Sequence, residues 1–453
     1  MRLQFITLAL SSFAVQAFRD PLAFASKVLV RFGYSPCKVS SAVTSLGGHV
    51  DSDFDTTILP SMGGSWNGCV LHVLTNSLPH SNGGYAIRSQ EILKAQLRRG
   101  ISASAITRLA YPLDIGRLPR SMQDEVDGIK YARSLPKIYP LNFDRQIKKH
   151  AELIISEAKE RNASVLHTTT PWPNAAATSL AAEQLGIPWI YEVRGQPEST
   201  WATTRGDERA ALMTKQYRQS RRKETEAMHA ARTVIALSEV SAGEIRGRGV
   251  RTPVWVVPNS VDDGWESRKV SKKEARNILS LDNCRYVGAV SSIVDYEGFD
   301  TLILALHYLP PDVKVLLVGD GSKLPALRKL ADRDGLLERV VFAGRQKRED
   351  MHLWYSALDV FAVPRKESQV TRTVTPIKTL QARAFGIPIV ATDLPALREA
   401  AGSHATFVPR MTPAKLAAAL ANALEFGGDS EPSSQLHTWR KTAKIYQKIY
   451  EDL

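Results

Sequence analysis

The chain has 453 residues, of which 43% are hydrophobic and 23% are charged, a composition typical of a folded globular protein and not of a disordered or fibrous one. Its length leaves room for two or three domains with separate cores. The 59 lysines and arginines outnumber the 46 acidic residues, and the net charge of +13 favours anionic partners such as phosphates or acidic lipid headgroups. The basic residues are spread along the chain without a recognisable nucleic-acid-binding module, so no nucleic-acid partner is predicted.

The three cysteines, Cys37, Cys69 and Cys284, lie far apart in the sequence. Their number is odd, and their spacing is neither that of a metal site nor that of a disulfide framework. We therefore expect a reducing compartment and no metal site.

The first 34 residues combine an apolar stretch with an amphipathic one. Residues 3–18 are uncharged and largely apolar, but at about 1.5 Å per residue they are too short to cross a bilayer core of roughly 30 Å. Apolar side chains then recur every three or four residues over 18–32, as in a weakly basic amphipathic helix. Three interpretations remain open: a secretory signal cleaved after Ala17, an anchor on a membrane surface, or a helix docked on the protein itself. Residues 35–67 have little periodicity and are predicted to be a linker.

From residue 68 onward, short apolar segments alternate with helical patterns. In the first array, strands are predicted at 70–74, 101–109, 164–167, 187–193, 233–237 and 254–257. The helices between them are predicted at 82–99, 145–161, 174–185 and 210–231. Strands that alternate with helices of this length indicate a parallel sheet covered on both faces.

The same pattern restarts in the second half, with strands at 286–290, 313–318, 339–343, 359–363 and 387–391. We therefore predict two Rossmann-like, doubly wound α/β domains joined near 258–271, with a terminal helix at 437–453. The predicted boundaries are 1–67 for the extension and linker, 68–262 for the first domain, 263–435 for the second and 436–453 for the terminal helix. In such sheets ligands bind beyond the carboxyl ends of the strands, so function is expected in the loops that follow strands.

Several of these loops carry short motifs in a fixed order. They are Leu78-Pro79 with Gly83-Gly84, Val165-Leu166-His167, Gly186-Ile187-Pro188, Tyr191-Glu192-Val193-Arg194-Gly195, Val257-Pro258-Asn259-Ser260-Val261-Asp262, Leu317-Val318-Gly319-Asp320-Gly321-Ser322, Phe342-Ala343-Gly344, Val363-Pro364-Arg365 and Ala384-Phe385-Gly386-Ile387-Pro388-Ile389-Val390-Ala391-Thr392. Each is short enough to occur by chance, but their joint order over about 68–453 resembles retaining glycosyltransferase family 4. The resemblance implies the GT-B architecture, in which two Rossmann-like domains face each other across a cleft and the terminal helix crosses back to the first domain.

In the first domain, the resemblance and the residue types single out four positions. Gly83 and Gly84 permit a ligand to approach the backbone, and the following helix N-terminus offers free N–H groups to a phosphate; a plain strand-to-helix turn is the alternative. His167 is expected at the end of its strand, where it would bind sugar hydroxyls or the acceptor unless it is a structural histidine. Arg194 is expected to face the cleft, with an ion pair to Glu192 as the alternative.

The second domain departs from the family pattern at the donor site. The family commonly has two glutamates in the segment that matches 372–381, where this chain has Arg372 or Thr373 and then Gln381. Gln381 can still form hydrogen bonds with ribose hydroxyls. The family's Arg and Lys that hold the diphosphate correspond to Ser292 and Glu297, neither of which is cationic.

Other cations near the donor loop are expected to hold the diphosphate instead. These are Arg365, Lys366, Arg372 and Lys378, with a solvated basic loop as the alternative for Lys366. Asn259, Gly319 and Thr375 complete the predicted donor-binding set. Arg372 is also predicted to be catalytic, together with His167 and Arg194.

The resemblance implies transfer of a sugar from a nucleotide diphosphate sugar to a lipid-linked or polysaccharide acceptor, with retention of configuration and without cofactor or metal. Because nucleotide sugars are cytoplasmic, we expect a cytoplasmic protein. It would be peripheral on the inner face of the membrane if 1–34 or the basic helix at 210–231 contacts anionic lipid; a solvated helix face is the alternative. The missing glutamates leave a second hypothesis open, a degenerate nucleotide-sugar-binding protein that acts as partner of another transferase. A dehydrogenase is not favoured, because no Gly-x-Gly-x-x-Gly opens a helix after a predicted strand.

Overall fold

The computed structural model describes residues 56–205, 207–402, 405–427 and 437–453. The three interpretations of the N-terminal segment therefore concern residues outside these ranges. The chain divides into two compact units: one extends to Ala236 and adds Ile245–Trp255 and Ala443–Leu453, and the other comprises Leu237–Glu244 and Val256–Thr442. Among the described residues, no helix combines the length and the apolar character needed to cross a bilayer.

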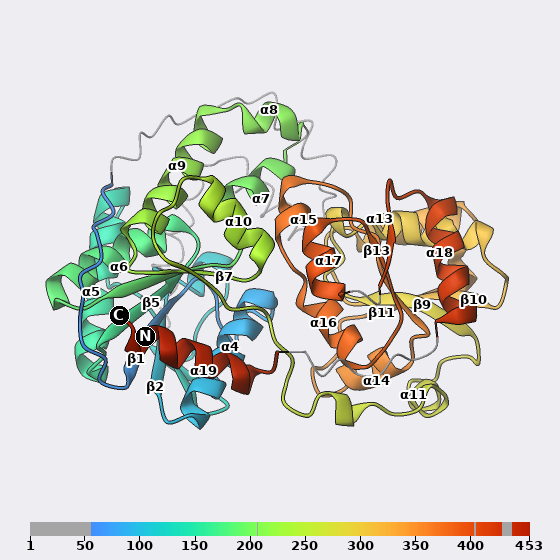
Figure 1. Cartoon of the computed structure of the whole chain (residues 1–453), viewed down its shortest axis with the longest axis horizontal. Helices are drawn as coiled ribbons and strands as arrows, with labels where there is room; N and C mark the ends of the chain where they lie inside the picture. Colours follow the sequence, from blue (N-terminus) through green and yellow to red (C-terminus); the bar gives the residue numbers. More distant parts are fainter. Residues whose placement is uncertain (1–55, 206, 403–404, 428–436) are drawn as a thin grey trace. The chain divides into compact units, whose positions relative to one another are not determined.

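The first unit is built on an eight-stranded sheet with the order β3-β4-β2-β1-β5-β6-β7-β8. Figure 1 labels β1, β2, β5 and β7 of this sheet. The strands are β1 (Cys69–Leu74), β2 (Ser102–Thr107), β3 (Gln123–Val126), β4 (Ile129–Ala132), β5 (Val165–Thr169), β6 (Trp189–Val193), β7 (Val234–Ala236) and β8 (Val254–Val256). Because β1 pairs in parallel with both β2 and β5, the chain winds outward in opposite directions from these central strands. The loops after β1 and β5 therefore border the switch point at which doubly wound sheets bind ligands.

The central strands are buried on both faces because their sequences are almost continuously apolar. Every residue of β1, β5 and β6 is buried, as expected for parallel strands covered by helices on both sides. The helices of this unit are α4 (Gly84–Arg98), α5 (Phe143–Arg161), α6 (Trp172–Leu185), α7 (Pro197–Thr203), α8 (Glu208–Leu212) and α9 (Lys215–Ala230). The strands predicted for this half are thus present, with small shifts of their ends.

Two features of the first unit differ from the prediction. Strands β3 and β4 form an antiparallel hairpin that was not predicted. Its turn, Asp127-Gly128, has φ values of 52° and 77°, and Asp-Gly is a strong hairpin signal because it tolerates this conformation. The helix predicted at 210–231 was wrong at its start: α9 begins at Lys215, where the side chain of Thr214 accepts a hydrogen bond from the backbone N–H of Tyr217.

The second unit contains a six-stranded sheet with the order β11-β10-β9-β12-β13-β14, and every pair of neighbours is parallel. The strands are β9 (Arg285–Val290), β10 (Val313–Val318), β11 (Val340–Gly344), β12 (Val360–Val363), β13 (Ile389–Thr392) and β14 (Thr406–Val408). The helices are α11 (Lys272–Ile278), α12 (Phe299–Ala305), α13 (Leu324–Arg333), α14 (Met351–Ser356), α15 (Gln369–Thr373), α16 (Ile377–Ala384), α17 (Pro395–Ala401) and α18 (Pro413–Phe426). This is the Rossmann strand order, with its switch point between β9 and β12. The prediction of two Rossmann-like domains is confirmed.

Two glycines allow the loops after β9, β10 and β12 to pack backbone against backbone. A Cβ atom on Gly319 would lie 1.8 Å from the carbonyl oxygen of Ser291, and one on Gly298 would lie 1.9 Å from that of Pro364. Both glycines also have positive φ, 140° and 72°, which side chains disfavour. Any other residue at these positions would push the loops apart at the carboxyl edge of the sheet.

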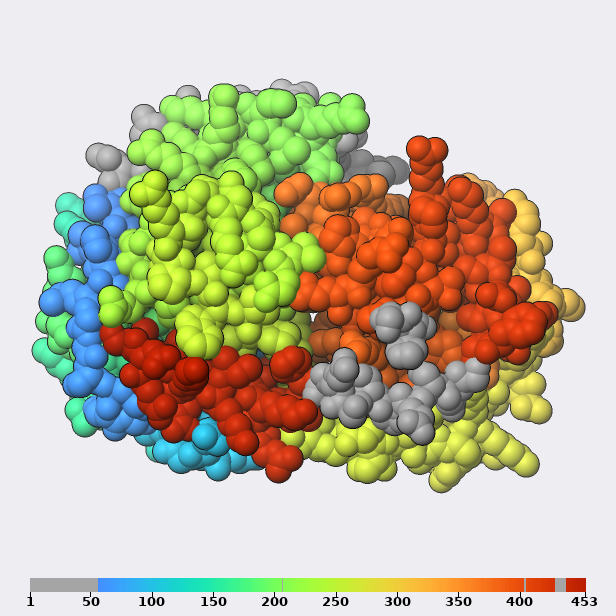
Figure 2. All heavy atoms as spheres, viewed as in Figure 1, coloured from blue at the N-terminus to red at the C-terminus, as the bar shows by residue number. Residues whose placement is uncertain are grey.

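The terminal helix α19 (Trp439–Glu451) contributes its last turns to the first unit, where it contacts α4 (Figure 1). Tyr446 and Tyr450 are fully buried, whereas Lys444 and Lys448 are exposed. The outward face of the helix is visible in Figure 2, where it forms part of the surface. Its sequence therefore has one apolar face for docking and one basic face for solvent.

Candidate active site

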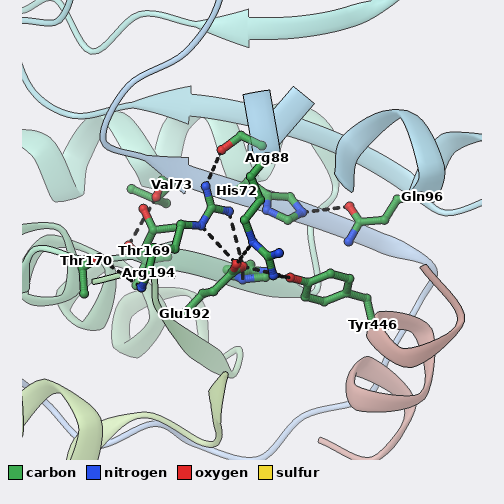
Figure 3. Close-up of polar contacts among 12 residues, drawn as sticks. His72, Val73, Arg88, Gln96, Thr169, Thr170, Glu192, Arg194 and Tyr446 are labelled. Atoms are coloured by element: carbon green, nitrogen blue, oxygen red, sulfur yellow. Dashed lines mark hydrogen bonds and ion pairs between the residues drawn. The ribbon is translucent and has the colours of Figure 1, made fainter. Parts of the chain in front are cut away.

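The buried carboxylate of Glu192 organises a polar cluster in the interior of the first unit (Figure 3). Arg88 Nε donates to Glu192 Oε1 at 2.7 Å and Arg194 Nε donates to the same oxygen at 3.0 Å. The hydroxyl of Tyr446 donates to Oε2 at 3.1 Å. Burial alone would raise the pKa of Glu192, but Arg194 and Arg88 hold it well below its usual value, so the side chain stays ionised.

His167 lies in this cluster and not at a strand end. Strand β5 continues to Thr169, so the prediction that His167 ends its strand was wrong. Its Nε2 lies 2.9 Å from Glu192 Oε2, its Nδ1 lies 2.8 Å from the hydroxyl of Tyr450, and its side chain is completely buried. Burial lowers the pKa of His167 despite the nearby carboxylate. The ring is therefore neutral at pH 7 and is held within the core of this unit.

A second histidine, His72, extends the cluster. Its ring centre lies 4.4 Å from that of His167, and its Nε2 lies 2.8 Å from Oε1 of Gln96. Burial and the adjacent His167 lower the pKa of His72 well below its usual value. Because two neighbouring charged imidazoles would repel each other, both rings are kept neutral.

Arg194 forms the ion pair with Glu192 that was the alternative to a cleft-facing position. Its Nη1 donates to the backbone carbonyl of Tyr85 at 3.1 Å and to Ser89 Oγ at 2.6 Å. With 2% of its side chain exposed, Arg194 joins β6 to the first turns of α4. A Cβ atom on Gly83, the N-cap of α4, would meet no other atom within 4 Å, so internal packing does not explain the glycine, and the helix terminus is open to a ligand.

A second polar cluster at the same sheet edge was not predicted from the sequence. His80, in the loop after β1, places Nε2 at 3.1 Å from Oδ2 of Asp124 on β3. Arg133 Nε donates to the same oxygen at 2.7 Å. The unpredicted β3–β4 hairpin positions Asp124, so recognition of its Asp-Gly turn would have been the signal that could reveal this cluster.

In the second unit, three of the four predicted cations are neutralised by carboxylates. Arg365 is paired with the buried Glu297 through Nη2–Oε1 at 2.8 Å and Nε–Oε2 at 3.1 Å. Lys366 contacts Asp300 at 2.8 Å and Asp295 at 3.3 Å. The remaining pair joins exposed Arg372 to Glu367 at 2.5 Å. The carboxylate of Glu297, unexpected next to a diphosphate site, is thus the partner of Arg365.

The fourth cation, Lys378, has a different environment. It lies in the first turn of α16, partly buried, and burial together with the charge of Arg348 lowers its pKa. No acidic side chain of the described residues pairs with it. A cation in this state gains most from an incoming anion, because the anion replaces lost solvation.

Other predicted donor-binding residues gather around the same start of α16. Asn259 Nδ2 donates to the backbone carbonyl of Thr375 at 3.3 Å, and Gln381 Oε1 accepts a hydrogen bond from the hydroxyl of Tyr355 at 3.0 Å. The hydroxyl of Thr375 is buried without a partner in the described part of the chain. Gly319 lies elsewhere, at the end of β10 against Ser291. Asn259, Thr375 and Lys378 thus lie around the start of α16, and Gln381 lies about one turn further along the same helix.

Within the described ranges, no three His, Cys, Asp or Glu side chains are arranged as metal ligands. The loops after β9 and β12 and the start of α16 combine cations and hydroxyls with the carboxylates that pair with Arg365 and Lys366. Such groups recognise phosphate and sugar hydroxyls.

Two family models match the chain, one in each half. Residues 83–260 match the glycosyl transferase 4-like domain and residues 284–425 match glycosyl transferases group 1. The chain is 30% identical over 141 residues to the GDP-mannose-dependent alpha-(1-6)-phosphatidylinositol monomannoside mannosyltransferase of Mycobacterium tuberculosis, covering 30% of this chain and 37% of the relative. It is 30% identical over 156 residues to the lipopolysaccharide core biosynthesis mannosyltransferase LpsB of Rhizobium meliloti, covering 32% of this chain and 42% of the relative. The chain thus spans less than half the length of these curated relatives.

Similar solved structures cover far more of the chain. Sucrose-phosphate synthase from Thermosynechococcus elongatus superposes with a TM-score of 0.69 at 19% identity, over 85% of this chain and 98% of that structure. Anabaena HepE in complex with UDP and glucose gives a TM-score of 0.67 at 18% identity, over 85% of this chain and 100% of that structure. Because these sequence identities are low, the structural similarity shows only that the fold is shared. The two sheets, the two consecutive family matches and these superpositions lead to one assignment: the chain has the GT-B fold, and each of its halves matches a glycosyltransferase domain.

Proposed function

We propose that the protein transfers a sugar from a nucleotide diphosphate sugar to a hydroxyl group of a lipid-linked or polysaccharide acceptor, with retention of configuration and without a metal. The observation that carries this proposal is the group at the start of α16, where Lys378 has no acidic partner among the described residues. The names of the relatives add support, since they include a GDP-mannose-dependent mannosyltransferase and a lipopolysaccharide core mannosyltransferase.

In the second unit, Lys378 binds the diphosphate, while Asn259, Thr375 and Gln381 bind the nucleoside or the sugar. Thr375 has a buried hydroxyl available for a hydrogen bond, and the side-chain NH₂ of Gln381 can donate to a ribose oxygen while its carbonyl oxygen stays with Tyr355. Gly319 lets the loop after β10 approach the ligand. Cations and N–H groups aimed at the departing diphosphate stabilise its negative charge, which is the role a metal has in other transferases.

Arg365 and Lys366 act at this site mainly by holding its loops. The Arg365–Glu297 pair joins the loop after β12 to the loop after β9, and Arg365 Nη1 also donates to the carbonyl of Val374 at 3.0 Å. Lys366 forms ion pairs with Asp295 in the loop after β9 and with Asp300 in the following helix, α12. Arg372, which is exposed and paired with the exposed carboxylate of Glu367, can exchange that partner for a phosphate at low cost, because exposed ion pairs contribute about 0–1 kcal/mol.

In the first unit, the N-terminus of α4 with Gly83 and Gly84 receives a phosphate or the donor sugar. His167 and Arg194 then act as positioning residues. They hold β5, β6 and α4 together through Glu192, and both side chains are almost completely buried.

We place the protein in the cytoplasm, peripheral on the inner face of the membrane. Arg218, Arg221 and Arg222 of α9 line a surface hollow of about 680 Å³, together with Arg248, which follows α10 (Glu239–Gly247) and is paired through Nη2 with Glu198 Oε1 at 2.8 Å. The guanidinium groups of the α9 arginines suit phosphate-bearing headgroups, with which arginine forms bidentate hydrogen bonds.

The test is turnover of a defined donor. Thermal shift against UDP-, GDP- and ADP-sugars identifies the donor, and release of the nucleoside diphosphate is then measured with and without a membrane extract as the acceptor source. Release that depends on the extract supports the proposal. Tight donor binding without release under any acceptor condition would instead favour a nucleotide-sugar-binding protein.

A further inference from the structure

His80 lies at the edge of the first sheet where a ligand is expected to bind. It lies in the loop between β1 and α4, three residues before Gly83, at the carboxyl edge beside the switch point of β1 and β5. Its side chain is 12% exposed, in contrast to the fully buried His72 and His167. Among the histidines that the structure describes in this sheet and its strand-end loops, His80 alone can touch a ligand.

The ring is oriented by the side chain of Asp124. His80 Nε2 lies 3.1 Å from Asp124 Oδ2, so this nitrogen carries the proton and Nδ1 carries the lone pair. In the described part of the chain no group forms a hydrogen bond with Nδ1. The free lone pair is therefore able to accept a hydrogen bond from a hydroxyl.

Asp124 is fixed in turn by Arg133. The Nε and Nη2 atoms of Arg133 lie 2.7 and 2.6 Å from Oδ2 of Asp124. Arg133 is buried, and it donates through Nη1 to Ser77 Oγ at 2.6 Å and through Nη2 to the carbonyl of Leu78 at 2.9 Å. The arginine thereby ties the β3–β4 hairpin to the loop that carries His80.

The charges around His80 keep it neutral. Burial lowers its pKa, and Arg133 and Arg117 lower it further, whereas Asp124 raises it; the ring of Tyr111 packs edge-on against the imidazole. The net pKa lies below the usual value, so at pH 7 the imidazole is a base and not an acid. A neutral, oriented imidazole with one free nitrogen is the arrangement that general-base catalysis requires.

We infer that His80 is a catalytic residue that binds the acceptor hydroxyl and takes its proton, with Asp124 and Arg133 as positioning residues. The inference rests on the proposed function. The acceptor oxygen forms a bond to the anomeric carbon, and the bond between that carbon and the diphosphate oxygen breaks, with its electron pair leaving on the nucleoside diphosphate. The hydroxyl proton passes to Nδ1 of His80 and then to solvent. Retention is compatible with this step, because the acceptor oxygen loses its proton whichever face of the sugar it approaches.

His80→Gln separates catalysis from packing. A glutamine retains an N–H group for Asp124 but lacks the imidazole base, so donor binding and the unfolding temperature should stay near those of the full-length wild type. We expect nucleotide release to fall by roughly 10²–10⁴-fold in kcat. The wild-type profile should decline as pH falls through the lowered pKa of His80, and this acidic limb should vanish in the variant. His307→Gln, an exposed histidine of the second unit, is the matched control and should retain wild-type turnover.

His80→Ala with added imidazole provides a second measurement that a purely structural role would not affect. Partial recovery of release with imidazole supports proton transfer at this position. If the wild type releases nucleotide and His80→Gln has the same activity and the same pH profile, the catalytic role of His80 is overturned, but the proposed transferase function still stands. Release that is absent from the wild type itself, with every donor and acceptor source, would overturn both.

Discussion

Replacing Lys378 by methionine removes one positive charge from the start of α16 while keeping the length of the side chain. Lys378 is partly buried without an acidic partner in the described residues, and burial and Arg348 lower its pKa. At pH 7 the charged form therefore destabilises the ligand-free protein, because a lysine whose pKa is depressed on folding costs stability at every pH below that pKa. The variant should consequently have a higher unfolding temperature than the wild type in the absence of nucleotide.

Nucleotide affinity should change in the opposite direction. A hydrogen bond between a lysine and a diphosphate contributes about 1.5–3 kcal/mol, so Lys378→Met should weaken binding by roughly 10- to 150-fold. Calorimetric titration with UDP, GDP and ADP measures the effect, with Lys329→Ala, an exposed lysine of α13 in the same unit, as the matched control. A variant that gains stability but binds all three nucleotides as tightly as the wild type would refute the assignment of Lys378 to the donor site.

Four further changes test other parts of the structure. Gly83→Ala meets no neighbouring atom, so calorimetry should show stability within about 1 kcal/mol of the wild type but weaker donor-sugar binding; equal binding would exclude a ligand at this helix end. Tyr446→Phe removes a hydroxyl from the buried cluster and should cost about 1–3 kcal/mol in denaturant unfolding; no change would mean that the cluster tolerates the loss. Arg222→Ala should reduce co-sedimentation with vesicles containing phosphatidylglycerol and leave nucleotide affinity unchanged; undiminished sedimentation would exclude this hollow as the contact. Burial and Glu198 raise the pKa of Glu224 from 4.5 to about 8, so between these two pH values the folded protein binds one proton more than the unfolded chain. The free energy of unfolding of the wild type should therefore fall by up to about 1.4 kcal/mol per pH unit as the pH rises from 4.5 to about 8. The Glu224→Gln variant should show no such fall.

Much of the fold follows from local sequence because buried parallel strands are recognisable as nearly unbroken apolar runs. β1 and β6 are examples, since every residue in each is buried. The β3–β4 hairpin escaped prediction because its strands are short and β3 is polar, with the sequence QDEV. Only its Asp-Gly turn carried a signal.

The side-chain partners of the candidate site were predictable only where they were close in sequence. Glu192 and Arg194 are two residues apart on one strand, and alternate residues of a strand share a face, so their ion pair was foreseeable. The Arg365–Glu297 pair spans 68 residues and the His80–Asp124 pair spans 44. Such pairs depend on which strands become neighbours in the sheet, and a local motif does not contain that information.

The docking of α19 constrains the order in which the protein can mature. Tyr446 and Tyr450, near the end of the chain, supply hydroxyl groups to Glu192, His167 and Gln96 in the interior of the first unit. A ribosome delivers these two tyrosines after the second unit, so the nascent first unit waits with an incomplete core while that unit is translated. Unmatched polar groups buried in the meantime carry a free-energy cost, and the core of the N-terminal half is therefore completed only after the second unit has been translated.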